Sequence, residues 1–374
     1  MRGSMVFVAG ALGCALAFVA TSPKGERVER SAVVASSAPT MPPIHLVGRF
    51  TSPGEAAARK TANDECASCH AEIADEWRAS LHRRSFVDPS FAKAFAMEPR
   101  AFCRDCHAPE ADPKMPVSNV AAELGISCVT CHASVGEHLE RVEHRALRSL
   151  ESLRTQGCAE CHQFPFPDLA FRRKPAFMQK TLDEHAASAK SNVSCASCHM
   201  PLAGADRHRS HAFVASRSAE MIRAALTLDA RRPVADRVVI TLTPNDVGHD
   251  VPTGDLLRRL AIEVTVGDPK KPRLTKVKYL ARHFGDEQQI PGVVVRVVKK
   301  DDRVGESPFT RVIFDVAADP SEPVFFRVIH QRVQNLSPTD ERRAIVAGEL
   351  VIFEGELCGE GEGTKPTWRR GVAP

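Results

Sequence analysis

Five copies of one short motif constrain this chain more than any other feature of its sequence. Each copy has two cysteines three positions apart and a histidine directly after the second cysteine. The copies are Cys66, Cys69 and His70; Cys103, Cys106 and His107; Cys128, Cys131 and His132; Cys158, Cys161 and His162; and Cys195, Cys198 and His199. In random order, the 12 cysteines and 15 histidines among 374 residues would give about 0.015 copies. Chance therefore does not explain the five copies.

The C-x-x-C-H motif is the attachment site of c-type haem, in which two thiols add to the vinyl groups and the adjacent histidine ligates the iron. Residues three apart in a helical turn project from one face, so both sulfurs reach the edge of one porphyrin. Paired C-x-x-C units also occur in zinc sites, and a haem-free chain with this many thiols would suggest disulfides. Neither alternative explains the histidine in all five copies. We therefore predict five covalently attached haem c groups.

Length and charge set broad limits on the rest of the chain. At 374 residues the chain exceeds one typical domain, so we expect two folded units and a tail. A net charge of +4 argues against a nucleic-acid binder and indicates no particular partner. The two cysteines outside the motifs, Cys14 and Cys358, have no obvious common bridge.

The first 20 residues are typical of an export signal, with Arg2 followed by an uncharged apolar run over residues 5–20. The run is short for a bilayer span, which favours cleavage, for example after Ala17. Acylation of Cys14 in a lipoprotein and an uncleaved membrane anchor are the two alternatives, and both attach the chain to a membrane through its N-terminus. All three place the rest of the chain outside the cytoplasm. We predict a periplasmic or cell-surface location.

Composition divides the chain further. Residues 21–60, rich in serine, alanine and proline, predict a flexible tether. The five motifs occupy residues 66–199, about 27 residues for each haem, so the haems themselves must supply most of the buried apolar area. Residues 61–235 are therefore predicted to form a pentahaem cytochrome c domain. Haems packed this closely are expected to exchange electrons with one another.

Apolar periodicity predicts helices over residues 71–81 and 133–156, and the prolines between 89 and 116 predict mostly loop around the second motif. Runs rich in β-branched residues predict strands at 238–242, 261–266, 293–298, 312–314, 324–329 and 344–353. The predicted fold class is therefore α+β, a mostly α/loop multihaem cytochrome c domain followed by an antiparallel β-sandwich-like domain at residues 236–358. Residues 359–374 read as a polar tail.

A six-coordinate electron-transfer iron needs a second strong ligand besides the motif histidine. Local sequence context selects five candidates, which are His82, His138, His185, His211 and His249. His211 competes with His208, three residues earlier on the same side, and only one of the two is expected to ligate. His249 lies among glycine and proline residues in a turn between predicted strands. The remaining assignments are structural, for His45, His283 and His330.

Several of these segments resemble one family. Cys66 to His82 has C-x-x-C-H followed by W-x-x-S-x-H, the third motif is followed six residues later by His138, and His199-Met200-Pro201 precedes an H-x-F segment that begins at His211. These features resemble the cytochrome c-554-type multihaem family. Residues 248–255, followed by two arginines, resemble the start of the β-domain attached to some of these cytochromes. The likeness covers roughly residues 60–355 and is close only in the motifs.

The resemblance implies bis-histidine haems in packed pairs and a periplasmic or surface role in electron transfer. Such proteins often have tryptophan after glutamate in the segment before the last haem, where this chain has Glu184-His185. That departure makes His185 attractive as a ligand.

The leading functional hypothesis is an electron carrier with no catalytic residues, which exchanges electrons with unidentified redox partner proteins. The alternative is an oxidoreductase that acts on a small nitrogen or sulfur compound at one five-coordinate haem. Multihaem nitrite reductases typically have lysine in place of one motif histidine, and hydroxylamine-oxidising relatives use a tyrosine cross-linked to haem. Here all five motifs end in histidine, and the single tyrosine, Tyr279, lies in the predicted β-domain. A third hypothesis makes the β-domain a docking module for a redox partner.

Overall fold

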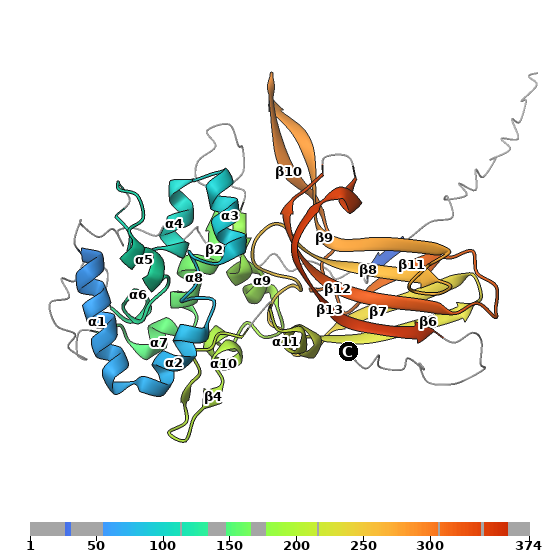
Figure 1. Cartoon of the computed structure of the whole chain (residues 1–374). Coiled ribbons are helices and arrows are strands. Elements are labelled where there is room, and N and C mark those ends of the chain that lie inside the picture. Colours follow the sequence, from blue (N-terminus) through green and yellow to red (C-terminus); the bar gives the residue numbers. More distant parts are fainter. Residues whose placement is uncertain are drawn as a thin grey trace, which may run out of the picture.

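The computed structural model of the chain describes residues 27–30, 55–112, 114–133, 147–165, 177–214, 217–305, 307–337 and 340–357. The predicted signal at 1–20, the tail at 359–374, Cys14, Cys358 and His138 all lie outside these ranges. Figure 1 shows a helical region on one side of the molecule and a β-rich region on the other. We call described residues 55–225 the helical region, and β1 (Arg27–Arg30) with residues 226–357 the β-region.

The helical region consists of short helices with little apolar core. Its helices are α1 (Glu55–Cys69), α2 (Ala71–Ala79), α3 (Pro89–Met97), α4 (Ala101–His107), α5 (Asn119–Leu124), α6 (Cys128–His132), α7 (Leu150–Leu153), α8 (Gln156–His162), α9 (Thr181–Ala187), α10 (Cys195–His199) and α11 (Ala219–Ala224). Two small hairpins pair β2 (Gln163–Pro165) with β3 (Phe177–Lys180) and β4 (Leu202–Ala203) with β5 (His208–Arg209). The buried apolar clusters here are small, one around Val129 and one of alanines around Ala121.

One predicted helix agrees with the structure, and one predicted loop does not. The helix expected over 71–81 is α2. The loop expected around the second motif is wrong, because α4 contains the motif and α3 precedes it. Pro89 stands in the first turn of α3, where its missing N–H is not needed, and the side chain of Asp88 caps that turn by accepting from the backbone N of Ser90 at 3.1 Å.

The single helix expected over 133–156 is wrong in the part that is described. Ala133 and Leu147 form an isolated antiparallel bridge, and Arg148 N donates to the His132 carbonyl at 2.8 Å. The chain therefore doubles back after the third motif, and the helices of this stretch are α7 and the start of α8.

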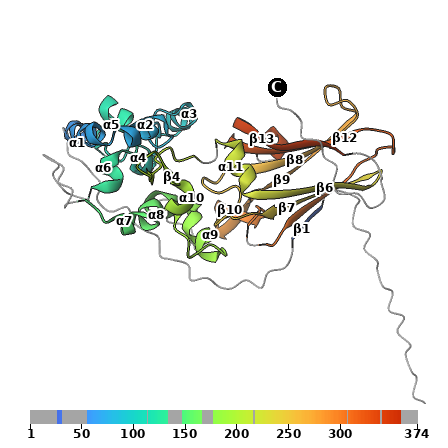
Figure 2. The same ribbon diagram turned by 90° about the horizontal axis from the view of Figure 1, so that it is seen from below.

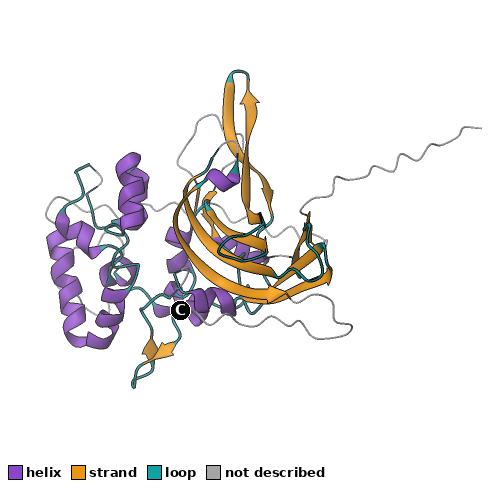
Figure 3. Cartoon of the chain, turned by 45° about the vertical axis from the view of Figure 1, so that its right-hand side comes forward, coloured by secondary structure: helices purple, strands orange, loops and turns teal. Residues whose placement is uncertain are grey.

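The β-region is built from two antiparallel sheets. One sheet has the order β1-β11-β7-β6 and the other the order β10-β9-β8-β12-β13. The strands are β6 (Leu226–Val234), β7 (Arg237–Pro244), β8 (Arg258–Val266), β9 (Leu274–Ile290), β10 (Val293–Asp301), β11 (Thr310–Asp315), β12 (Val324–Asn335) and β13 (Ile345–Leu357). Figures 2 and 3 show the strands gathered apart from most of the helices.

One large apolar core lies between these sheets. It joins residues of the first sheet, such as Ile240 and Phe314, to residues of the second, such as Ile262 and Phe326. Inward-facing residues alternate with outward-facing ones along β7 and β11, as expected for strands buried on one face. The region is thus a two-sheet antiparallel sandwich.

Three strands of the β-region lie outside the predicted set. Strand β6 begins at Leu226, before the predicted boundary at 236, and β9 carries many polar residues because its distal half forms a hairpin with β10 that projects beyond the sheet (Figures 1 and 3). Strand β1 falls within the predicted tether and pairs with β11, where Glu29 lies 3.5 Å from Arg311. Helix α1 also begins inside the predicted tether.

The two regions touch at defined points. Helix α11 packs on the sandwich core through Ile222, and Arg223 Nε donates to the Ile352 carbonyl at 2.9 Å. Glu184 Oε1, in α9, lies 2.9 Å from Arg282 Nη2, in β9. Within the described ranges, no helix is both long and apolar enough to cross a membrane.

Candidate haem sites

Each of the five motifs lies on or at the end of a helix, and all of these helices except α1 have only five to seven residues. The two cysteines of each motif project from one helical turn, as expected. Helices of five to seven residues are marginal alone and need local support. Helix α6 has a capping box, in which Ser127 and Thr130 bond to each other's backbone N–H groups. The Asn63 side chain, from α1, also accepts from Cys128 N at 2.9 Å. The motif helices are thus held by neighbouring helices.

Contacts between motifs give an order in space that differs from the order in sequence. The Asn63 contact joins the first motif to the third. Arg148 joins the third to the fourth, because its backbone N bonds to His132 and its guanidinium lies 2.6 Å from Glu160 Oε1. The fourth and fifth motifs meet where the side chains of Cys158 and Cys195 lie next to each other. The motifs therefore run in the order first, third, fourth, fifth.

Three motif histidines face three other histidines. The ring centres lie 6.5 Å apart for His82 and His162, 6.2 Å for His132 and His211, and 6.0 Å for His199 and His249. Two imidazoles that bind one metal from opposite sides have ring centres about 6 Å apart, because each metal–nitrogen bond is about 2 Å and each centre lies about 1 Å beyond its nitrogen. The spacing of all three pairs fits one iron between the rings.

Hydrogen bonds at Nδ1 prepare several of these rings to bind iron. Nδ1 of His107 donates to the Ser85 carbonyl at 2.7 Å, that of His211 to the Arg209 carbonyl at 2.7 Å, and that of His249 to the Asp250 carbonyl at 3.0 Å. Because a carbonyl oxygen only accepts, the proton must be on Nδ1, and the lone pair is on Nε2. These bonds leave Nε2 as the atom that can ligate a metal.

Burial keeps several of the rings neutral. Burial, with smaller contributions from neighbouring histidines, lowers the pKa of His82 to about 3 and that of His132 to about 4. A neutral imidazole is the form that binds metal. Nδ1 of His82 is buried and has no hydrogen-bond partner among the described residues, so this ring lacks the support that the other rings have.

The backbone around His82 explains its position. The Trp77 indole donates to the Ile126 carbonyl at 2.7 Å, and Ile126 N donates to the His82 carbonyl at 2.9 Å. Gly125 has a φ of +53°, and a Cβ there would lie 2.6 Å from the His82 carbonyl oxygen. The Phe213 ring packs 4.2 Å from the His82 ring. Trp77 and Gly125 therefore fix the turn that points His82 at the fourth motif.

Glu184, in α9, joins the helical region to the His249 loop, which is residues 245–257 between β7 and β8. Its Oε1 lies 2.9 Å from Arg282 Nη2 and 2.8 Å from Arg303 Nη2, and Thr253 donates to its Oε2 at 2.5 Å. Only 6% of Glu184 is exposed. Burial alone would raise the pKa of Glu184, but the two arginines outweigh burial and lower it. This buried ion pair was not predicted, because its members are far apart in sequence.

Arg303 holds the same loop from the β-region. Its Nη1 donates to the Pro252 carbonyl at 3.0 Å, and its Nη2 lies 2.8 Å from Asp250 Oδ2. A side chain at position 305 would collide with the Asp250 carboxylate, so Gly305 permits this close approach. The segment that follows His249 is therefore fixed by buried charges.

The other predicted ligands have different surroundings. His185 donates from Nδ1 to the Gly248 carbonyl at 2.9 Å, and no described motif histidine lies opposite its ring. It supports the His249 loop, and its role as a ligand stays a prediction, as does that of His138, which lies outside the described residues. Of the competing pair, His211 faces His132, whereas His208 lies among carboxylates.

Comparison with known proteins adds the family context. Residues 65–133 match the family model described as cytochrome c554 and c-prime, and no curated protein matches the chain. The structure is similar to that of a penta-heme cytochrome c552 from Thermochromatium tepidum, with a TM-score of 0.55 and 18% identity over 82% of this chain and 98% of that chain. At this identity the likeness shows the fold.

A second solved structure, MtrC from Shewanella baltica OS185, gives a TM-score of 0.20 and 16% identity over 72% of this chain and 47% of that chain, which is too low to carry an argument. Together, the family match and the penta-heme fold support a multihaem c-type cytochrome that resembles the c554 family. They also support covalently bound haem c and a role in electron transfer.

Proposed function

We propose that this chain is an exported cytochrome that binds five haem c groups, mostly with two histidine ligands, and transfers electrons between redox partner proteins. The observation that carries the proposal is the spacing of 6.0 to 6.5 Å in three histidine pairs. We assign His82 to the iron of the fourth motif, His211 to that of the third and His249 to that of the fifth. His138 is proposed as a further ligand from its place after the third motif.

Haem iron supplies one-electron redox chemistry, and the protein sets its potential through the second ligand, burial and nearby charge. The described residues support this role in two ways. Three histidines lie about 6 Å from a motif histidine, as two ligands of one iron would, and contacts join four of the motifs in a series. A carrier needs both properties, because a closed coordination shell excludes substrates and short separations permit electron exchange.

The test replaces His82, His211 and His249 with alanine one at a time in the exported holo-cytochrome. We expect each variant to convert one haem from low-spin to high-spin, as measured by absorbance and electron paramagnetic resonance of the ferric protein. His283→Ala is the matched control, because His283 lies in β9 and pairs with Asp302 and Glu341. Low-spin spectra in all three variants would refute the assignment. Intact mass of the same samples counts the haems and reports cleavage or acylation within residues 1–20.

A second candidate function is supported by one site. Among the described histidines, none faces His107 at the spacing of the three pairs, and the Phe91 ring stacks on it at 3.7 Å. Burial lowers the pKa of His107, and the carboxylate of Asp255, in the His249 loop, partly offsets that shift. The same carboxylate acts on His330, whose buried Nε2 has no hydrogen-bond partner among the described residues.

A motif histidine that no other described imidazole faces is what an oxidoreductase of small nitrogen or sulfur compounds would have at a five-coordinate haem. Carbon monoxide distinguishes the two functions. Binding to one haem of the reduced wild-type protein, with the others unchanged, favours the oxidoreductase. Absence of binding at every haem rules it out and leaves the carrier.

A further inference from the structure

A notch beside strands β8, β9 and β10 is rich in positive charge. Four arginines line it, which are Arg258, Arg259, Arg282 and Arg296, and Glu341 supplies the one carboxylate among the described residues of its lining. Every lining residue lies between 256 and 341, so the notch belongs to the β-region. The cavity has a volume of about 60 Å³. At about 10 to 15 Å³ for each water molecule, it has room for a small ion but not for a nucleotide.

Arg282 has an unused hydrogen-bond donor at this notch. Its side chain is only 4% exposed, and its Nη2 donates to Glu184 Oε1 at 2.9 Å. Its Nε lies 3.9 Å from Asp301 Oδ2, which is too far for a hydrogen bond. Nη1 is buried and has no hydrogen-bond partner in the described part of the chain. Because a buried donor on a charged group costs free energy when it is unmet, Nη1 calls for an acceptor oxygen.

Arg259 is a second buried guanidinium of the same notch, and its neighbours are mostly neutral. The residue is 3% exposed. Its Nε donates to Gln331 Oε1 at 2.9 Å, its Nη1 donates to the Glu341 carbonyl at 2.8 Å, and its guanidinium carbon lies 3.7 Å from the centre of the Tyr279 ring. The Glu341 carboxylate bonds instead to His283, with Oε1 2.6 Å from Nδ1. Burial lowers the pKa of Arg259, as expected for a cation without a close counter-ion.

The other two arginines of the notch have carboxylate partners. Arg258 Nε lies 2.9 Å from Asp255 Oδ2, and Arg296 Nε lies 3.3 Å from Asp286 Oδ1. Their charges still add to the positive potential of the notch, because each pair is partly exposed and its carboxylate is not part of the lining. The binding argument therefore depends on Arg259 and Arg282.

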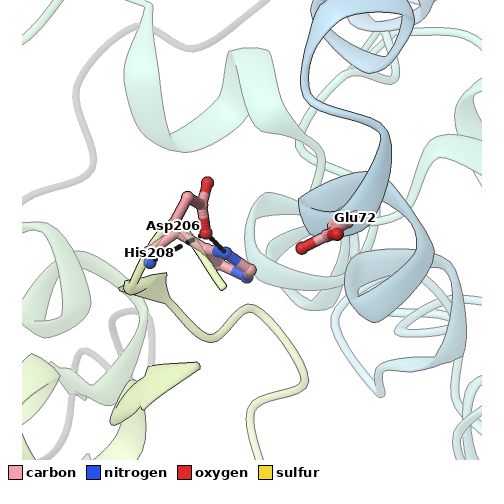
Figure 4. A group of neighbouring side chains, drawn as sticks. All are labelled: Glu72, Asp206 and His208. Carbon is pink, nitrogen blue, oxygen red and sulfur yellow. Dashed lines mark hydrogen bonds and ion pairs between the residues drawn. The ribbon is translucent and has the colours of Figure 1, made fainter. Parts of the chain in front are cut away.

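A cluster of opposite charge in the helical region gives a useful contrast. Between α2 and the β4–β5 hairpin, Asp206 and His208 face Glu72 (Figure 4). Both ring nitrogens of His208 have carboxylate partners, Asp206 Oδ1 at 2.7 Å from Nδ1 and Glu76 Oε2 at 3.3 Å from Nε2. The imidazole there finds its partners within the chain, whereas the two buried arginines of the notch leave a donor unmet.

We propose that Arg259 and Arg282 bind one small oxyanion group in this notch. A guanidinium group matches the oxygens of carboxylate, sulfate and phosphate groups, and its hydrogen bonds to them are charge-assisted. The oxyanion has two sources, a free anion of the size of sulfate or a propionate of an attached haem, and only the second source rests on the proposed haems. The site goes beyond electron transfer. Since Leu256 and Leu257 of the His249 loop also line the notch, the bound group would steady that loop.

The test for a free anion titrates the full-length holo-cytochrome with sodium sulfate in a calorimeter, at an ionic strength kept constant with sodium chloride. We expect one sulfate for each chain. Arg259→Gln should weaken binding at least about tenfold, because it removes a charged partner of the anion. Arg231→Gln is the matched control, because Arg231 is exposed on β6 and pairs with Asp229. This variant should bind sulfate as the wild-type chain does.

A haem propionate in the notch gives a different result. The wild-type chain then binds no sulfate, and Arg259→Gln lowers the midpoint potential of one haem, because loss of a nearby positive charge favours the ferric state. Redox titration followed by absorbance measures this shift, and Arg231→Gln should leave every potential unchanged.

Two outcomes overturn the proposal. One is equal sulfate binding by the wild-type chain and Arg259→Gln, and the other is no sulfate binding together with unchanged potentials in Arg259→Gln. If circular dichroism shows that Arg259→Gln has not folded, Arg296→Gln takes its place under the same two criteria, because the Arg296 side chain is 46% exposed. Failure of the haem-ligand assignments would appear as unchanged spin states in the histidine variants and would leave the sulfate result untouched.

Discussion

The two regions of this molecule bury apolar surface in different ways. The β-region has one cluster of buried apolar side chains that joins both sheets, whereas the helical region has only small clusters built largely of alanine. A cluster of alanines buries too little area to offset the entropy of ordering these segments. The β-region therefore encodes its own core in its sequence, whereas the helical region, with the proposed haems attached, would take most of its core from them.

Removal of haem should have the largest effect, and only on the helical region. In a chain with Ser at all ten motif cysteines, we expect the helical region to lose its folded structure, because its remaining apolar clusters are too small. The β-region should keep its sheets. Circular dichroism and hydrogen exchange of the two regions check this outcome. Protection of α1 to α10 equal to that of the haem-loaded chain would contradict it.

A substitution in the sandwich core should destabilise the β-region and not the helical region. Phe326→Ala removes a fully buried ring from the sandwich core and should lower the free energy of unfolding of the β-region by about 3 to 5 kcal/mol. The absorbance of the haems away from the junction should not change below the unfolding transition. Val294→Ala is the control, because Val294 is exposed on β10. Chemical denaturation followed at both regions measures the effect, and equal losses in the two variants would contradict it.

Glu184 lies at the junction between the two regions, where it contacts Arg282 and Arg303. Glu184→Gln removes the negative charge that Arg282 and Arg303 share. Because both arginines stay buried, the free energy of unfolding should fall by roughly 3 kcal/mol. We expect a fraction of the haem at the fifth motif to become high-spin, since the His249 loop loses its support. The other haems should stay low-spin. Glu349→Gln, on the exposed side of β13, is the control, and a spectrum identical to wild type in Glu184→Gln would show that the ion pair does not position His249.

The smallest expected effect is the pH dependence of the stability of the β-region. Burial alone would lower the pKa of His283, but hydrogen bonds to Asp302 and Glu341 outweigh burial and raise it to about 9. The pKa of His283 in the folded protein lies above its value in the unfolded chain. The hydrogen bonds of His283 to Asp302 and Glu341 therefore stabilise the β-region below about pH 6.5, and this contribution is lost as pH rises through 9. We expect a loss of about 2 kcal/mol between pH 6 and pH 10, measured by denaturation. His283→Gln should remove this dependence, and an unchanged pH profile would refute the assignment.

The sequence predicted the features that depend on local pattern. Repeated cysteine spacing located the motif helices, and β-branched runs located β7, β8 and β10 to β13. Strand β9 is absent from the predicted set because polar residues dominate its projecting half. Helix α3 is absent because its proline stands at the first position of a helix, where proline does not break it.

The pairing of histidines depends on contacts between distant segments. His82 follows the first motif in sequence yet faces His162 of the fourth, and His211 follows the fifth motif yet faces His132 of the third. Nothing in the residues next to His82 indicates this, because the Gly125 and Ile126 turn that directs it is more than 40 residues away. The ion pairs of Glu184 were missed for the same reason.

The pairing of His199 with His249 has a consequence for the order of assembly. His199 belongs to the helical region and His249 to a loop between strands of the β-region. A chain that crosses a membrane with its N-terminus first delivers all five attachment motifs before any of the strands β7 to β13. Under the proposed assignment of His249 to the fifth haem, that site is complete only after the loop between β7 and β8 has been delivered and has folded.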